Sequence, residues 1–293
     1  MALSISKKPL SSIPLLATIA TLLIILHNLN SANAASFLFN RFDQSNQQNL
    51  IIQGDASVSS NGALQLTKVD NNGFPQVGSV GRALYSEPIT LYNSSTGEVA
   101  SIFTSFVFLI SSPFDTLPAD GLTFFLASPE TTIPPNSVGG YLGLFSPSNN
   151  ALNNTRKELK STSDEKVFAI EFDTYPNRNL GDPDYKHIGI DVNSIKSEFT
   201  REWGFQNGET VAVTIFYYPY VKRLRVFAGY GDGYNVDFNY DIDLTTVLPE
   251  QVRVGFSGST GEYAQINNIL SWSFSSSLGK SFNVENGGIA SLV

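Results

Sequence analysis

Hydrophobic and polar residues alternate along many short segments of the chain. Clear examples are 187–192 (HIGIDV), 223–230 (RLRVFAGY) and 251–257 (QVRVGFS). Alternation with a period of two is typical of a β-strand that buries one of its faces. Clusters of Gly, Pro, Asn, Asp and Ser separate the segments, and no segment has a convincing amphipathic helical pattern of three turns. Further strands are predicted at 37–42, 62–67, 99–110, 121–127, 166–174, 210–218 and 269–276.

The spacing of these segments predicts a single all-β domain. No composition break, repeat or linker follows residue 35, and the chain contains 21 Phe and 12 Tyr, residues that favour strands. We therefore expect an antiparallel β-sandwich of jelly-roll type, in which two sheets enclose an aromatic core. Trp203 and Trp272 are assigned to this core. The chain has no Cys, so the core must be stable without disulfides.

The first residues have the layout of a secretory signal peptide. Lysines precede an apolar stretch over 13–26, and an A-x-A pattern ends at Ala34, where we expect cleavage. The apolar stretch is shorter than the ~20 residues that cross a bilayer. We thus expect no membrane span, and a location in the secretory pathway, extracellular or vacuolar. The predicted parts are a signal peptide, a folded domain and a flexible tail, at residues 1–34, 35–282 and 283–293.

The charge balance excludes one class of partner. The chain carries 18 basic and 26 acidic residues, a formal net charge of −8. An acidic protein is repelled by polyanions, so no nucleic-acid partner is expected. Two Asn-X-Ser/Thr sequons, at Asn93 and Asn153, predict N-glycosylation in a secreted chain; the alternative is that both are ordinary turn residues.

A cluster of metal-ligand residue types lies between residues 171 and 187. Glu171 and Asp173 are two apart on a predicted strand, so their carboxylates point to the same face. An oxygen-rich loop with Asn177 and Asp182 follows, and His187 opens the next strand. Carboxylates with one imidazole suit Mn²⁺, and a neighbouring site with oxygen ligands alone suits Ca²⁺.

Two other interpretations of this cluster stay open from spacing alone. The carboxylates could be solvated groups at a strand end, with His187 at the surface. Alternatively, some β-sandwich glycosidases place acids at two-residue spacing on one strand as acid and nucleophile. Glu171 and Asp173 fit that pattern, but the next position is Tyr175. A retaining mechanism would lack its partner in this strand, so hydrolysis is disfavoured.

The stretch from Ala169 to Asp191, with IEFDTYPN, GDP and HIGIDV in order, resembles the metal-binding signature of the legume lectins in its concanavalin-type form. The resemblance extends over the mature chain through GDASVSSNGALQLT (54–67), LPADGLTFFLA (117–127), LPEQVRVGFSGSTG (248–261) and LSWSF (270–274). It implies the jelly-roll sandwich and two bound ions that shape the sugar loops without catalysis. The implied Mn²⁺ ligands are Glu171, Asp173, Asp182 and His187, and the implied Ca²⁺ ligands are Asp173, Asn177, Asp182 and the carbonyl of Tyr175.

The same resemblance implies a sugar site. Asp120, after a cis peptide bond, would accept sugar hydroxyls, and Asn177 would donate its amide. The backbone N–H of Gly140 would reach the sugar, and the ring of Tyr175 would stack on its apolar face. The loop after Gly261 is short, which resembles mannose/glucose-specific members more than galactose-binding ones. The implied site residues are Asp120, Gly140, Tyr175, Asn177, Glu262 and Tyr263.

The resemblance finally implies a role and partners. We expect a non-catalytic, Ca²⁺/Mn²⁺-dependent lectin that binds glycans and glycoproteins through a shallow monosaccharide site. Family members are usually dimers or tetramers, so a homodimer or homotetramer is expected, which would add avidity to weak single sites. The alternative from another class is a lectin-like storage or defence protein with weak or no sugar binding. All the implied site residues are present, which argues against this alternative.

Overall fold

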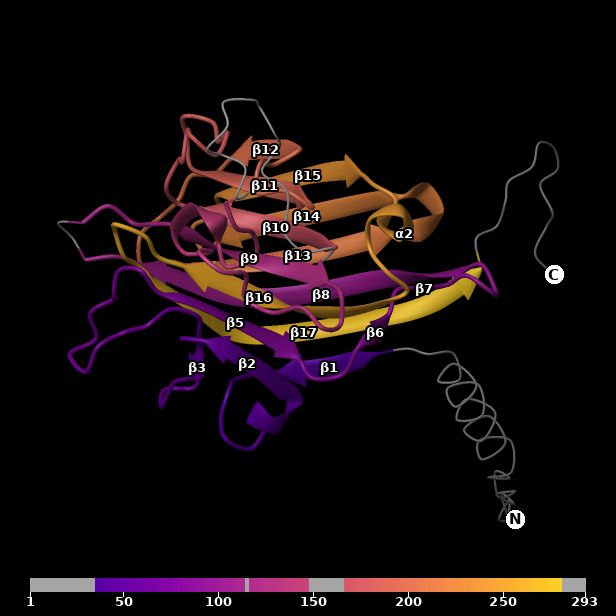
Figure 1. Cartoon of the computed structure of the whole chain (residues 1–293), viewed down its shortest axis with the longest axis horizontal. Coiled ribbons are helices and arrows are strands. Elements are labelled where there is room, and N and C mark those ends of the chain that lie inside the picture. The colour runs from indigo at the N-terminus through magenta and orange to yellow at the C-terminus, as the bar shows by residue number, and fades with distance from the viewer. Residues whose placement is uncertain (1–34, 114–115, 148–165, 281–293) are drawn as a thin grey trace, which may run out of the picture.

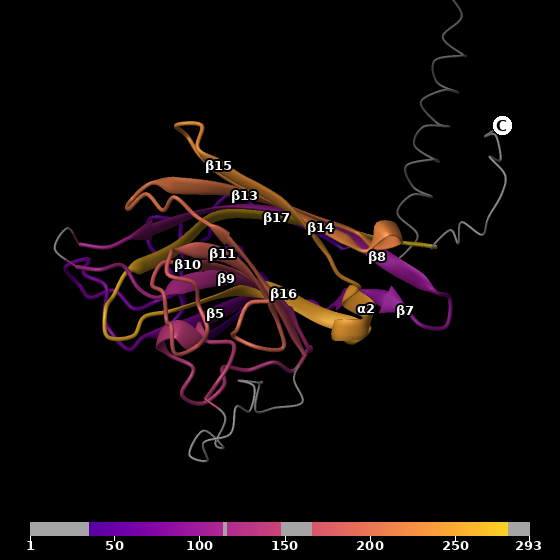
Figure 2. The same ribbon diagram turned by 90° about the horizontal axis from the view of Figure 1, so that it is seen from above.

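A computed structural model describes residues 35–113, 116–147 and 166–280. The predicted signal peptide, the C-terminal tail and the Asn153 sequon lie outside these residues. The described chain folds into two antiparallel sheets stacked face to face, as the two layers in Figure 2 show. The prediction of an all-β jelly-roll sandwich is confirmed.

The first sheet contains nine strands within the described residues, and we call it the nine-stranded sheet (Figure 1). Its main strand order is β15-β14-β13-β8-β17-β4-β3, with β1 paired to β17 and β7 paired to β8. The strands are β1 (Ser36–Phe39), β3 (Ser57–Val58), β4 (Leu64–Gln65), β7 (Tyr92–Asn93), β8 (Glu98–Ser111), β13 (Thr210–Tyr218), β14 (Arg223–Tyr230), β15 (Asn235–Asp241) and β17 (Ile266–Lys280).

The second sheet contains eight strands within the described residues, and we call it the eight-stranded sheet. Its main order is β12-β11-β10-β9-β16-β5-β2, with β6 paired to β16. The strands are β2 (Leu50–Gly54), β5 (Val80–Tyr85), β6 (Ile89–Thr90), β9 (Gly121–Ala127), β10 (Val167–Asp173), β11 (His187–Val192), β12 (Phe199–Glu202) and β16 (Gln251–Ser259). The helices of the described chain are short: η1 (Gln47–Asn49), η2 (Gly139–Tyr141), η3 (Pro219–Val221) and α2 (Leu244–Val247).

Aromatic side chains from both sheets meet in the space between them. Phe256 on β16 packs edge-to-face against Phe106 of β8, with ring centroids 4.9 Å apart, and against Trp272 of β17 at 4.8 Å. Trp203 is also buried, so both tryptophans belong to the core as predicted. Edge-to-face pairs of this kind add to the free energy gained by burying apolar area.

The eight-stranded sheet is buried on its outer face as well. Every residue of β9 and β10 is buried, whereas β13 of the other sheet alternates between buried and exposed positions. Residues 142–145, which follow η2, cover the outer face and form a second core with Phe125 and Ala169. The covering segment has no strand periodicity, so the sequence did not predict this second core.

Strand limits differ from the predictions where polar residues or turns intervene. The segment 62–67 contains only the two-residue strand β4, and 37–42 is a strand only as far as Phe39. The chain turns there, and the N–H of Phe42 donates to the carbonyl of Gly62 instead of extending the ladder. Edge strand β15 was missed, although its sequence NVDFNYD alternates polar and apolar residues as a half-buried strand does. The predicted hairpin after Tyr218 is present, closed by η3.

Candidate functional site

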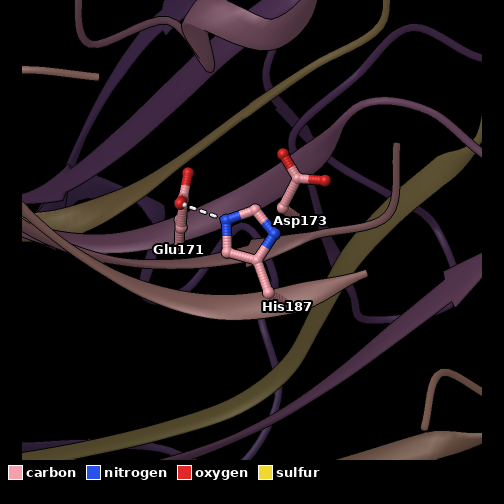
Figure 3. Close-up of side chains that lie close together, drawn as sticks. All are labelled: Glu171, Asp173 and His187. Atoms are coloured by element: carbon pink, nitrogen blue, oxygen red, sulfur yellow. Dashed lines mark hydrogen bonds and ion pairs between the residues drawn. The ribbon is translucent and has the colours of Figure 1, made fainter. Parts of the chain in front are cut away.

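Three metal-ligand side chains converge at the end of the β10–β11 pair. Asp173 lies directly opposite His187 in the antiparallel register, and Glu171 lies two residues back on the same face. All three are at most 2% exposed, and one ligand atom from each lies within 4.8 Å of the others (Figure 3). Nε2 of His187 is 2.9 Å from Oε1 of Glu171. The predicted convergence of these residues is confirmed.

The loop after β10 brings the other predicted ligands to the same end of the sheet. Among the described residues, the close group contains Glu171, Asp173 and His187 but not Asp182. Asp182 is half-buried, and its Oδ2 accepts a hydrogen bond of 2.6 Å from the N–H of Asn177. The Oδ1 atom of Asn177 is buried and has no hydrogen-bond partner. Such an orphaned acceptor requires a donor or a cation.

The crowded carboxylates strongly disfavour full ionisation without a counter-ion. Burial, together with the charges of Glu171 and Asp182, raises the pKa of Asp173 well above its ordinary value. Burial and the charge of Glu171 raise the pKa of Asp182 to about 6. Burial lowers the pKa of His187, but its hydrogen bond to Glu171 and the nearby negative charges outweigh this effect and raise it. A divalent cation would relieve the repulsion, so the donor set fits bound metal.

Sequence reasoning missed two residues behind this cluster. The hydroxyl of Ser197 lies 2.5 Å from Oε1 of Glu171 and 2.6 Å from Oδ1 of Asp191, and it can donate its single proton to either. Asp191 is fully buried, and burial and the charge of Glu171 raise its pKa well above the ordinary value. The alternation that puts His187 on one face of β11 also puts Asp191 there, which could have identified it.

A shallow pocket of about 180 Å³ lies beside the carboxylate cluster. All six residues that the resemblance assigned to the sugar site contribute to its lining. Four segments that are distant in sequence supply them, three from loops at strand ends and one from the short helix η2. The lining consists of Ala119, Asp120, Gly139, Gly140, Tyr175, Asn177, Gly261, Glu262 and Tyr263.

Asp120 lines the pocket, and its backbone is held by hydrogen bonds on both sides. The Ala119–Asp120 peptide bond is cis, as implied by the resemblance. The N–H of Asp120 donates to the carbonyl of Ser259 at 3.1 Å, and its carbonyl accepts the N–H of Thr174 at 2.9 Å. Its buried Oδ2 has no hydrogen-bond partner. Burial raises the pKa of Asp120 to about 7. The unpaired Oδ2 leaves one acceptor site of the ionised carboxylate open to polar hydrogens of a ligand.

Two glycines of η2, Gly139 and Gly140, line the pocket beside Asp120. Gly139 has a φ of 67°, a backbone conformation that residues other than glycine rarely adopt. A Cβ atom at Gly140 would collide with the amide group of Asn177. The backbone of η2 therefore approaches the Asn177 side chain closely, which explains why residue 140 is glycine.

Two aromatic rings and one acidic side chain form the rim of the pocket. The rings of Tyr175 and Tyr263 are 5.5 Å apart between centroids and inclined at 39°. Tyr263 is 38% exposed, and Glu262 beside it is also exposed. Ring faces that are open to solvent can stack on apolar surfaces of a ligand. The pocket thus combines a carboxylate, an amide, backbone groups and ring faces next to a metal-ligand cluster, which is the chemistry of a carbohydrate-binding protein.

Comparison with known proteins identifies the family. A family model for the legume lectin domain matches residues 34–288. Agglutinin-2 from Cladrastis kentukea is 51% identical over 277 residues, which are 93% of this chain and 91% of that protein. A mannose/glucose-specific lectin from Centrolobium tomentosum is 48% identical over 249 residues, covering 84% and 97% of the two chains. The chain belongs to the legume lectin family.

A solved structure supports the same conclusion. Lectin UEA-II complexed with galactose superposes with a TM-score of 0.73 at 44% identity, covering 84% of this chain and 99% of that one. The matching family is a lectin domain and not an enzyme family. Among the residues that the structure describes, no helix is long and apolar enough to cross a membrane.

Proposed function

We propose that the protein is a non-catalytic lectin that depends on Ca²⁺ and Mn²⁺ and binds one sugar ring of a glycan in the pocket around Asp120. The observation that carries this proposal is that Asp120, Asn177 and Gly140 line one cavity beside the buried Glu171–His187 pair. Glycans and glycoproteins are the proposed partners. The presence of the complete polar lining favours this function over a storage or defence protein without sugar binding.

Each lining group has a distinct role in the proposed complex. The unpaired oxygen of Asp120 accepts hydroxyl protons of the sugar, and the amide nitrogen of Asn177 donates to a sugar oxygen. The backbone N–H of Gly140 donates as well, because no side chain there keeps the ligand away. Tyr175 stacks on the apolar face of the ring, and Glu262 and Tyr263 contact the ligand from the rim.

Bound cations would complete the pocket without taking part in a reaction. They neutralise the crowded carboxylates and hold the loop from Thr174 to Asp182 in place. The orphaned Oδ1 of Asn177 is a natural Ca²⁺ ligand, which leaves the amide nitrogen for the sugar. The proposed Mn²⁺ ligands are Glu171, Asp173, Asp182 and His187, and the proposed Ca²⁺ ligands are Asp173, Asn177, Asp182 and the carbonyl of Tyr175.

We also propose a preference for mannose and glucose over galactose. The loop between β16 and β17 is short, since it extends only from Thr260 to Gln265. One relative is named for mannose/glucose specificity, while another is solved with galactose. The two relatives therefore differ in the sugar they are named with, and the short loop is the feature that favours mannose and glucose here.

Further proposals concern assembly and processing. We propose secretion after removal of residues 1–34, a location outside the cell or in the vacuole, and a homodimer or homotetramer. Asn93 ends β7, and its Oδ1 accepts hydrogen bonds from the N–H and the hydroxyl of Ser95. The neighbouring Ser94 and Ser95 are exposed, so we propose this sequon as a glycosylation site. The Asn153 sequon is proposed from the sequence alone.

A glycan-binding profile tests the function directly. The purified protein is applied to an array of mannosides, glucosides and galactosides with Ca²⁺ and Mn²⁺ and again after chelation at mildly acidic pH. We expect binding to mannosides and glucosides that chelation abolishes. Asp237→Asn, on exposed strand β15, serves as a matched control for Asp120→Asn and retains binding. Strongest binding to galactosides would contradict the sugar preference, and normal binding by Asp120→Asn would contradict the site.

A further inference from the structure

A network of buried polar side chains lies behind the pocket. Its members are at 0% exposure, although two are amides and two are hydroxyls, residue types that are mostly exposed in proteins. They come from separate parts of the chain that meet under the loops of the site. The members are Thr67, Thr174, Gln265 and Asn267.

Hydrogen bonds join these side chains into a continuous path. The hydroxyl of Thr174 lies 2.7 Å from Oε1 of Gln265 and 2.9 Å from the carbonyl oxygen of Asp120. Nε2 of Gln265 donates to Oδ1 of Asn267 at 2.8 Å, and Nδ2 of Asn267 donates to Thr67 at 3.3 Å. The Thr67 hydroxyl then donates to the backbone carbonyl of Gln265 at 3.2 Å. The path therefore returns to Gln265 and fixes both its side chain and its backbone.

The network connects three of the four segments that line the pocket. Thr174 directly precedes Tyr175, and its N–H and hydroxyl both contact the carbonyl of Asp120. Gln265 follows Tyr263 by two residues. One side chain, that of Gln265, therefore links the rim loop to the segments of Asp120 and Tyr175.

The rim loop, Thr260 to Gln265, is hydrogen-bonded to the rest of the protein near its two ends. At its start the N–H of Thr260 donates to the carbonyl of Ser79 at 2.9 Å, and near its other end the carbonyl of Ala264 accepts a hydrogen bond of 3.3 Å from Ser112. Within the described part of the chain, Glu262 and Tyr263 themselves have no hydrogen bonds to protein groups. Apart from the ring contact between Tyr263 and Tyr175, their positions depend on the two ends of the loop, and Gln265 anchors one of these ends.

We propose that Gln265 is a positioning residue for glycan binding: its buried amide sets the place of Glu262 and Tyr263 relative to Asp120 and Tyr175. This inference rests on the proposed lectin function and deepens it. Because Gln265 does not line the pocket, it acts on the ligand only through the loop. Loss of its two side-chain hydrogen bonds would let the rim loop shift, which changes affinity more than it changes the metal site.

The test replaces Gln265 by a side chain of similar length without polar atoms. Gln265→Met is compared with wild type by calorimetric titration with methyl α-mannoside and methyl α-galactoside at saturating Ca²⁺ and Mn²⁺. We expect affinity for the bound glycoside to fall about tenfold, the cost of a few misplaced contacts. Metal content, measured by elemental analysis, stays at the wild-type value.

A matched control separates positioning from general destabilisation. Thr104 is also fully buried, and its hydroxyl donates to Ser273 and accepts from Trp272, far from the pocket on β8. Thr104→Val lowers the melting temperature but keeps glycoside affinity within about twofold, since no pocket loop moves. Thr174→Val weakens binding, whereas Thr174→Ser, which keeps the hydroxyl, restores it.

The results distinguish failure of the inference about Gln265 from failure of the proposed lectin function. If the wild-type protein binds a glycoside and Gln265→Met binds it with the same affinity, the inference alone is overturned. An equal loss of glycoside affinity in Thr104→Val would also overturn the inference alone. If Gln265→Met does not fold, the inference is tested by comparing Thr174→Val with Thr174→Ser. Equal glycoside affinity of these two variants would overturn the inference. Failure of the wild-type protein to bind either glycoside or any arrayed glycan would overturn the proposed function and the inference with it.

Discussion

Two buried regions of this molecule differ in the kind of side chain they enclose. The space between the sheets contains aromatic and aliphatic residues such as Phe106, Phe256 and Trp272. The end of the β10–β11 pair instead encloses Glu171, Asp173 and His187 at equally low exposure. Burial of apolar area stabilises the first region by itself, whereas burial of several carboxylates requires protons or cations.

The difference separates what maintains the fold from what forms the site. The apolar core contributes free energy that depends little on pH or metal. The acidic region costs free energy at neutral pH until a cation is bound, so the loops near it are expected to respond to metal. The fold and the pocket should therefore be separable by experiment.

The largest effect is expected in the apolar core. Phe256 is fully buried against Phe106, Phe124 and Trp272. Phe256→Ala should lower the free energy of unfolding by about 3–5 kcal/mol, because it removes a buried ring and leaves a cavity. Denaturant unfolding with and without metal should give the same loss. A loss that appears only in the metal-loaded protein would contradict the separation.

Metal binding is expected to stabilise the protein through the acidic region. At cation concentrations about a thousandfold above the dissociation constant, the free energy of unfolding should rise by about 4 kcal/mol. Glu171→Gln should remove most of this gain, since it deletes one proposed ligand and its charge. Asp237→Asn, on the exposed edge strand β15, is the control and should keep it. An equal gain in wild type and Glu171→Gln would show that the cations stabilise the fold elsewhere.

The pH dependence of stability should reverse when metal is removed. Burial raises the pKa of Asp120 to about 7 and that of Asp182 to about 6, above the ordinary value of 3.8. The metal-free folded state therefore holds protons that the unfolded state releases. Its stability is greatest below about pH 4 and falls by about 1.4 kcal/mol per pH unit for each such proton as the pH rises towards 7.

The metal-loaded protein should show the opposite trend in the same pH range. Cations keep the carboxylates ionised, and protons compete with them as the pH falls. Chemical denaturation of the metal-free and the metal-loaded protein between pH 4 and pH 7 measures both trends. This range is chosen because the raised pKa values of Asp182 and Asp120 are about 6 and about 7. A metal-free protein that becomes more stable as the pH rises would show that the buried carboxylates are not the groups that set this dependence.

The smallest effect is expected at the rim. Tyr263 is 38% exposed and contacts Tyr175 on one side only. Tyr263→Ala should reduce glycoside affinity several-fold, of the order of 1 kcal/mol for one partly exposed ring face, with unfolding unchanged. Titration calorimetry checks the affinity, and Tyr220→Ala, at an exposed tyrosine of η3, is the control. Equal affinity in wild type and Tyr263→Ala would remove the ring from the ligand contacts.

Much of the sandwich could be predicted from alternation alone. The limits of β11, β13 and β14 agree with the segments predicted from the pattern, because apolar residues recur at every second position of each segment. Two-residue strands such as β6 and β7 could not be recognised, since they carry no pattern and their pairing depends on neighbours. Edge strand β15 alternates over seven residues and could have been recognised. The covering of β9 and β10 by residues 142–145 depends on tertiary contacts that no local pattern records.

The site residues likewise divide into those that the sequence predicted and those that it did not. Two-residue spacing and the family signature pointed to Glu171, Asp173 and six of the nine residues that line the pocket. Neither signal identified Asp191, Ser197 or Gln265, whose importance comes from partners distant in sequence. Alternation from His187 along β11 could have indicated Asp191. The position of Gln265 against Thr174 follows only from the packing of two loops.

The central claim is that the carboxylate of Asp120 binds sugar in a pocket that metal completes. The most direct measurement is calorimetric titration of wild type and Asp120→Asn with methyl α-mannoside, each with Ca²⁺ and Mn²⁺ and after chelation. We predict binding by the metal-loaded wild type alone, with the unfolding midpoint of metal-loaded Asp120→Asn at least as high as that of wild type, because a buried charge is removed. Equal binding by Asp120→Asn, or full binding after chelation, would contradict the account.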